Sequence, residues 1–170
     1  MSPELIKQIS SFLRRCSKLH PTLVIAGNHD CNLNNPDRLD VLSPIMDMMD
    51  DDNLFYLKNS GVYKIGDVGV GVFSILDDSE NYISGIDITD PDIKTKIGVY
   101  HGAVKRSMTD IGYVVMGGDI ELPMFNGYDI VMLGDIHKYQ ILQEYQSEHR
   151  FIPESKVDEY KLQGWCVSDD

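Results

Sequence analysis

The stretch Thr22-Leu-Val-Ile-Ala-Gly-Asn-His-Asp30 joins a short apolar run directly to side chains that can do chemistry. The run Leu23–Ala26 is uninterrupted, as expected for a strand that is buried on both faces of a parallel sheet. Functional groups in such sheets lie just beyond the carboxyl ends of the strands. We expect Gly27 to allow a sharp turn there, because glycine has no Cβ atom. The turn then presents a carboxamide, an imidazole and a carboxylate, from Asn28, His29 and Asp30.

Two later segments repeat this arrangement of an apolar strand followed by a potential ligand. The run Ile97–Tyr100 ends at His101, and the run Asp129–Leu133 leads into Asp135 and His137. Asp135 and His137 are two positions apart, so in an extended segment both side chains would point to the same side. A single histidine after a strand is more often a structural residue than a ligand. Three strand ends that each carry Asn, His or Asp instead predict loops that converge on one metal centre.

The donor atoms of these loops indicate which metals the centre would bind. Carboxylate and carboxamide oxygens together with imidazole suit manganese, iron or zinc. The cysteines include no Cys-x-x-Cys pair, so the sequence predicts neither a thiolate zinc site nor a disulfide framework. Two divalent ions in one site can hold a phosphate and activate a water molecule for in-line attack. The cysteines are Cys16, Cys31 and Cys166.

The same segments resemble a known enzyme family. Gly27-Asn-His-Asp30 resembles the third signature motif of the calcineurin-like metallophosphoesterases, and His101 is similar to the lone metal-binding histidine of the fourth. Gly134-Asp-Ile-His137 resembles a variant of the closing Gly-His-x-His motif. Within the superfamily the chain is most similar to the nuclease subunit of SbcCD-type DNA-repair complexes, including their phage and viral relatives. The resemblance extends from Leu5 to Gln140.

The resemblance implies a role for each motif residue. Asn28, His101 and Asp135 would hold the second of two divalent ions, and His137 would hold the first. The family has histidine where this chain has Asp135, and a carboxylate would shift the preference from zinc toward manganese or magnesium. Manganese is therefore the expected ion, with iron, magnesium and zinc as alternatives. Two other interpretations stay open: the segment 135–137 as the family's first motif, or as a structural turn.

The catalytic residues implied by the resemblance are His29 and Asp30. His29 would donate a proton to the leaving oxygen, and Asp30 would orient its ring and keep it protonated. The family's first two motifs, an Asp-x-His and a Gly-Asp, should precede this point. The segment 1–26 contains Glu4 and His20 but no aspartate. We therefore expect a fragment that begins downstream of the second motif and that is weakly active or inactive when isolated.

Composition limits the classes of partner and location. The 170 residues suit one domain, and the net charge of −12 argues against a broad basic face for DNA. The charge does not exclude DNA, because bound divalent ions can make a site locally positive. No apolar run approaches the ~18 residues of a membrane span, and no signal pattern is present. We expect a cytoplasmic protein, or one in the host cytoplasm if the source is viral, with no membrane partner.

The predicted fold is an α/β protein, and the resemblance implies a four-layer αββα metallophosphoesterase sandwich that is incomplete at its N-terminus and at its C-terminus. Residues 1–145 would form the partial metallophosphoesterase domain, and residues 146–170 a C-terminal extension. We expect four methionines in the core, Met108, Met116, Met124 and Met132. The other predicted helices span Pro3–Leu19, Asn35 to about Met49, and Glu154–Gln163. The other predicted strands span Leu54–Leu57, Gly61–Ile65, Val68–Phe73 and Tyr139–Tyr145. We expect the strands at 54–57, 61–65 and 68–73 to lie in the second sheet.

The functional hypothesis is metal-dependent hydrolysis of phosphodiesters by a DNA exonuclease or endonuclease of the double-strand-break repair type. The resemblance also implies an SbcC-like ATPase partner and possible homodimerisation. One alternative is a generic metallophosphatase that acts on small molecules or phosphoproteins, since the cleavage motifs are shared. An alternative from another class is an inactive structural or partner-binding fragment.

Overall fold

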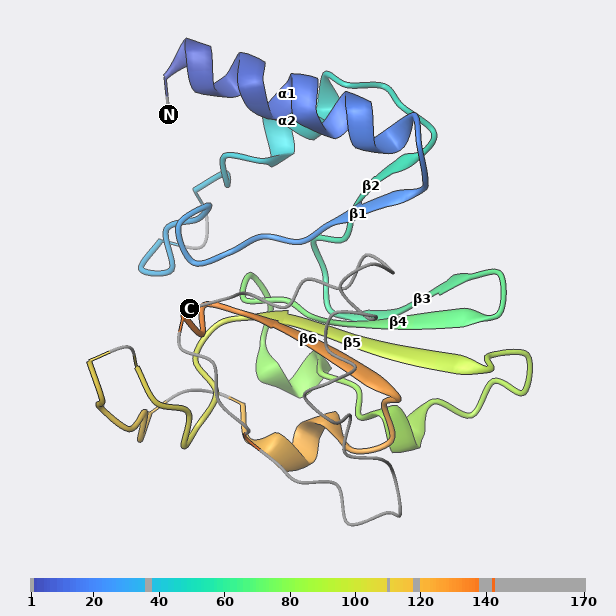
Figure 1. The fold of residues 1–170 in the computed structure, drawn as a ribbon, viewed down its shortest axis with the longest axis vertical. Coiled ribbons are helices and arrows are strands. Elements are labelled where there is room, and N and C mark those ends of the chain that lie inside the picture. The colour runs from blue at the N-terminus through green and yellow to red at the C-terminus, as the bar shows by residue number, and fades with distance from the viewer. Residues whose placement is uncertain (1, 36–37, 110, 118–119, 138–141, 143–170) are drawn as a thin grey trace, which may run out of the picture.

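The protein is a mixed α/β structure with few helices, seen here in a computed structural model (Figure 1). The structure describes residues 2–35, 38–109, 111–117, 120–137 and 142. A two-stranded parallel sheet carries two helices on one face and packs with its other face against a four-stranded mixed sheet. The boundary predicted at residues 145 and 146, the strand predicted at 139–145 and the helix predicted at 154–163 lie outside the described residues. Within the described residues, none of the helices combines the length and apolar character that crossing a membrane requires.

The first helix, α1, spans Pro3–Ser17. This confirms the helix predicted over Pro3–Leu19, except that α1 ends two residues earlier. Ser2 caps it, because its hydroxyl oxygen accepts a hydrogen bond from the Leu5 amide at 3.3 Å, and Pro3 begins the first turn. The apolar stripe of α1 packs onto the small sheet and onto the second helix. The buried members of this cluster are Leu13, Ile45 and Met49.

The second helix, α2 (Ser43–Asp47), is much shorter than the predicted segment 35–49. The predicted start is wrong because Asp40 takes the local backbone donors: its Oδ1 atom accepts the amides of residues 42 and 43 at 3.0 and 2.8 Å. Pro44 then occupies the first helical turn, where its missing amide costs nothing. Asp40 and Pro44 therefore mark the start of α2, and residues 38–42, where the predicted helix would run, are not helical.

The small sheet pairs β1 (Thr22–Val24) with β2 (Leu54–Tyr56) in parallel, with Leu23 opposite Phe55. The prediction that the strand at 54–57 lies in the second sheet is wrong, since β2 joins the first. Val24 packs against the helices, whereas Leu23 packs toward the four-stranded sheet. The burial of β1 on both faces is thus confirmed, although its side chains are only half-buried.

The larger sheet has the strand order β3-β4-β5-β6, in which the first pair is antiparallel and the other pairs are parallel. The predicted strands at 61–65 and 68–73 are confirmed. β5 extends to His101 and β6 to Gly134, so the apolar run and the motif residue belong to one continuous strand in each case. β1, β5 and β6 all run toward the left of Figure 1, which brings their carboxyl ends to one edge. The strands are β3 (Gly61–Ile65), β4 (Val68–Phe73), β5 (Thr95–His101) and β6 (Ile130–Gly134).

Two further clusters of side chains hold the layers together. Leu57, Val70 and Val72 fill the space between the sheets. The outer face of the larger sheet carries an aromatic cluster, in which the Phe73 and Phe125 rings meet edge to face with centroids 5.1 Å apart. Loops and three short 3₁₀ helices cover this cluster. These helices are Ser79–Asn81, Gly85–Asp87 and Leu122–Phe125.

The prediction of four core methionines is wrong for three of them. Met116 is 81% exposed, Met132 is 54% exposed and Met108 is also exposed, whereas Met124 packs against the aromatic cluster. Met108 and Met116 lie in the loop between β5 and β6, and Met132 lies on the end strand of the sheet as the described residues form it. Among the described residues, fewer neighbours cover these positions than the middle of the sheet.

Candidate metal centre

Three side chains from three strand ends meet at the edge of the two sheets. Asn28 follows β1, His101 ends β5 and Asp135 follows β6, and all three side chains are half-buried. The Asn28 Nδ2 atom donates to Asp135 Oδ1 at 3.0 Å, and Asn28 Oδ1 lies 3.3 Å from His101 Nε2. The sequence prediction that these loops converge agrees with this geometry. Their role as metal ligands stays a prediction.

The His101 ring lies between two glycines that come from the other two loops. A Cβ atom at Gly27 would lie 2.9 Å from His101 Nε2, and one at Gly134 would overlap Nδ1. Neither glycine has a positive φ. A turn does begin at Gly27, as expected, but it does not need a positive φ there. The ring can take this position because neither glycine carries a Cβ atom.

The motif turn is closed by Asp30. The Asp30 amide donates to the Gly27 carbonyl at 2.9 Å, and the Gly27 amide donates to Asp30 Oδ2 at 2.9 Å. The resemblance assigns Asp30 to orient His29, but the two side chains, both described, share no hydrogen bond and His29 is exposed. Burial, with the nearby Asp30 charge, raises the pKa of the Cys31 thiol, which keeps this cysteine protonated. The turn thus offers an exposed imidazole and no thiolate.

Asp135 adopts a left-handed backbone conformation with φ at 71°. The expectation of an extended segment at Asp135 is wrong, because β6 ends at Gly134 and the chain turns at Asp135. The Asp135 and His137 side chains nevertheless line the same hollow. Aspartate tolerates this conformation better than most residues, but it still costs about 1–3 kcal/mol, which the hydrogen bond from Asn28 helps to offset. His137 is exposed and lines a hollow of about 250 Å³ together with Asp135.

The cluster has the donor types for a divalent ion but not a full coordination shell. Across the part of the chain that the structure describes, no group of three His, Cys, Asp or Glu side chains could hold a metal. Asn28 supplies the third donor here through its amide oxygen, which lies beside His101, while its amide nitrogen faces Asp135. Oxygen, nitrogen and oxygen donors suit manganese or magnesium more than zinc. The residues therefore fit one ion, with further ligands still required.

The sequence analysis did not identify Asp40, a buried residue that stabilises the motif loop. Asp40 is 3% exposed, accepts a hydrogen bond from the Tyr56 hydroxyl at 2.9 Å and pairs with Lys58 at 2.9 Å. Burial alone would raise the pKa of this carboxyl, but hydrogen bonds from neighbouring side chains, Ser43 first, hold that pKa below its usual value. The next amide, that of residue 41, donates to the Asp30 carbonyl at 2.9 Å. The bonds of Asp40 to Tyr56 and Lys58 join segments far apart in sequence, so the sequence pattern does not report them.

The comparisons with known proteins identify one relative and no family. A viral protein named "Uncharacterized protein R555", from Acanthamoeba polyphaga mimivirus, is 41% identical over 151 residues. The match covers 85% of this chain, and the chain spans only 11% of that relative. No family model matches the chain, and no solved structure matches it. The name of the relative states no activity, so the functional argument rests on the geometry above.

Proposed function

We propose that this chain forms part of a metal-dependent phosphodiesterase of the calcineurin-like superfamily, of the SbcCD-type nuclease kind. The observation that carries the proposal is the convergence of Asn28, His101 and Asp135 from three separate strand ends. The order of layers lends further support: helices, a small sheet, a larger sheet and an outer layer of 3₁₀ helices and loops. This order is compatible with an αββα sandwich whose outer helical layer is reduced in the described residues.

In this proposal Asn28, His101 and Asp135 hold one divalent ion, with manganese preferred because Asp135 offers a hard carboxylate. Bound ions of this kind neutralise phosphate charge and activate water for in-line attack. His137 would hold the other ion of the pair, the first by the resemblance, and polypeptide outside the described residues would supply the remaining ligands. The activity and partners of the whole protein, including an SbcC-like ATPase, are part of the same proposal.

In this proposal, some residues of the chain would hold the metal ion and others would transfer a proton. His29 is exposed on the motif turn, where it can approach a leaving oxygen and donate a proton. Asp30 fixes that turn through its two hydrogen bonds with Gly27, so it positions His29 through the backbone. His101 would hold the ion in this proposal and its ring is half-buried, so the exposed His29 is the better placed of the two to donate a proton.

Two histidine variants of the full-length protein test the proposal. We expect His29→Asn to retain manganese affinity while the hydrolysis of an aryl phosphodiester falls about 10²–10⁴-fold. We expect His101→Ala to weaken manganese binding in a calorimetric titration, because a ligand is lost. His20→Asn, at an exposed histidine without motif context, is the matched control and should change neither quantity. Equal loss of manganese affinity in His29→Asn and His101→Ala would overturn these roles.

A further inference from the structure

The loop that joins β5 to β6 exposes several large apolar side chains close together in the sequence. Single apolar side chains on a surface are ordinary, but a group of them is typical of a place where another molecule binds. The described part of this loop extends away from the two sheets in Figure 1. Its exposed apolar side chains are Met108, Ile111, Tyr113, Val114 and Met116.

Backbone hydrogen bonds give this loop a defined shape. At its base Val104 and Ile120, both fully buried, form a parallel bridge. Further along, the Arg106 amide donates to the Val115 carbonyl at 2.8 Å, and the Val115 amide donates to the Ser107 carbonyl at 2.8 Å. A partner that binds such a pre-formed surface loses less conformational entropy than one that must first order the loop.

A groove lies between the base of this loop and the 3₁₀ helix Leu122–Phe125. Its volume of about 410 Å³ is within the range typical of binding pockets. Val115 and Met116 from the loop, with Leu122 and Pro123 from the 3₁₀ helix, supply its apolar lining. We call this space the loop groove.

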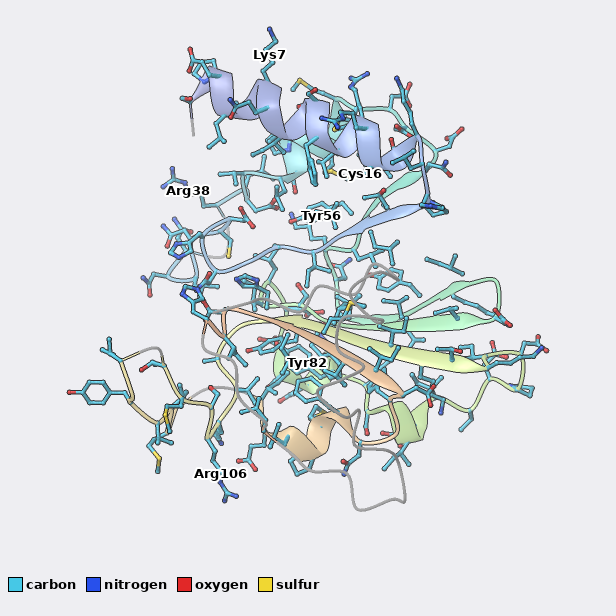
Figure 2. All side chains as sticks on the ribbon, viewed as in Figure 1. Lys7, Cys16, Arg38, Tyr56, Tyr82 and Arg106 are labelled. Carbon is cyan, nitrogen blue, oxygen red and sulfur yellow. The ribbon has the colours of Figure 1, made fainter. Side chains whose placement is uncertain are left out.

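The described lining of the loop groove carries more positive than negative charge. Lys105 pairs with Glu121 at 2.7 Å, so these two charges are matched. Arg106 forms no ion pair or side-chain hydrogen bond with the residues that the structure describes, and it attracts Glu121 only at longer range. Its side chain points away from the two sheets in Figure 2. A guanidinium in this position can bind a carboxylate of a partner through two parallel hydrogen bonds.

The charges also indicate which class of partner suits the loop groove. A nucleic acid backbone is held by several clustered cations, whereas this lining has an excess of one. An anionic membrane surface, or a second copy of this chain, would be repelled by the net charge of −12. A segment of another protein with one carboxylate beside an apolar side chain matches both the apolar lining and the unpaired Arg106.

We propose that the loop groove is a docking site for a segment of another protein that carries a large apolar side chain next to an aspartate or glutamate. The apolar side chain packs against Val115, Met116 and Leu122, and the carboxylate pairs with Arg106. The docking site uses none of the three candidate metal ligands, so it does not depend on the proposed function.

Selection from a phage-displayed library of random peptides on the full chain tests the proposal. We expect the enriched peptides to share a large apolar residue beside an acid. A synthetic peptide of the shared sequence, labelled with a fluorophore, is then titrated with the chain in a fluorescence anisotropy assay. Replacing its acid by the corresponding amide should weaken binding about two- to fivefold, the usual effect of losing a partly exposed ion pair.

Charge reversal at Arg106 tests the role of the guanidinium. Arg106→Glu should bind the acidic peptide more weakly than the unaltered chain does, and it should prefer a peptide in which lysine replaces the acid. Arg15→Glu, at an exposed arginine of α1 that does not line the groove, is the matched control and should keep the preference for the acidic peptide.

Two methionines test the apolar contact. Met116→Ser should weaken the peptide about tenfold, because it removes apolar surface that binding buries. Met48→Ser, at a methionine that is 69% exposed and lies outside the groove, should leave the affinity unchanged.

Four results would each overturn the proposal. They are the absence of enriched peptides, a shared sequence without an acid beside an apolar residue, equal affinity of Arg106→Glu and the unaltered chain for the acidic peptide, and equal effects of Met116→Ser and Met48→Ser. Self-association in analytical ultracentrifugation that Met116→Ser abolishes would identify a second copy as the occupant instead. Sedimentation with phosphatidylserine vesicles that Met116→Ser abolishes would identify a membrane instead, and either result would also overturn the proposal.

Discussion

Replacing Gly134 by alanine tests whether the candidate centre depends on the glycines around His101. Gly134 ends β6 with an ordinary φ, so alanine fits the backbone. Its methyl group would overlap His101 Nδ1, and the ring would have to move by about 1 Å to restore a normal contact. The ring must therefore shift away from Gly134 to relieve the overlap. This shift changes the position of Nε2 relative to Asn28.

The magnitude of the effect follows from this overlap. Overpacking a filled site costs about 1–3 kcal/mol, and we expect Gly134→Ala to lower the free energy of unfolding by about 2 kcal/mol. Moving the ring also takes Nε2 away from Asn28 Oδ1, now 3.3 Å distant. Asn28 and His101 are both proposed ligands, so displacing the ring separates two donor atoms of one site, and we expect manganese affinity to fall. Gly134→Ala should therefore lose both stability and manganese affinity.

Urea denaturation and calorimetric titration with manganese measure the two effects. The control is Gly117→Ala, because Gly117 has no positive φ and a Cβ atom there would meet nothing within 4 Å. In the background of His101→Ala, where the ring is absent, Gly134→Ala should lose most of its destabilising effect. Gly134→Ala that unfolds like the unaltered protein and keeps its manganese affinity would refute the reasoning.

Further predictions concern the groups that support the site and the core. Asp40→Asn should destabilise the fold by about 1–3 kcal/mol, because it weakens the pairing with Lys58 and the bond from the Tyr56 hydroxyl; urea denaturation at neutral pH checks this. The pKa of Asp40 is lower in the folded than in the unfolded state, so its stabilisation is present above the unfolded pKa near ~4 and is lost as pH falls through the folded value. The acid unfolding curve of Asp40→Asn should be flatter than that of the unaltered protein, and parallel curves would contradict the assignment. Burial raises the pKa of Tyr128 to about 12, so this phenol should resist ionisation in an absorbance titration up to pH ~11. Tyr128→Phe should lower the free energy of unfolding by about 1 kcal/mol, because it removes the hydrogen bond to the Ile83 carbonyl.

Local patterns were sufficient to predict the strands and the first helix. β3 and β4 were found from alternating or continuous apolar residues between turn signals, and α1 from its cap and stripe. The start of α2 was missed although its signal is local, because Asp40 accepts the amides of residues 42 and 43 and Pro44 follows. The sheet membership of β2 was missed for a different reason, since strand pairing depends on contacts far along the chain.

The candidate ligands could be predicted because functional groups in parallel sheets lie just beyond the carboxyl ends of the strands, and strand ends can be found from the sequence. Asn28, His101 and Asp135 each stand at or just after the end of a parallel strand. The enclosure of His101 by glycines could not be predicted, because it depends on the spacing of three segments far apart in sequence. The same holds for the left-handed turn at Asp135, which apolar patterning does not report.

Anomalous X-ray scattering from crystals of the protein grown with manganese tests the central claim most directly. The account predicts a manganese peak bordered by the side chains of Asn28, His101 and Asp135. A peak located instead beside Asp77 and Asp78, or the absence of any peak next to His101 at saturating manganese, would contradict it.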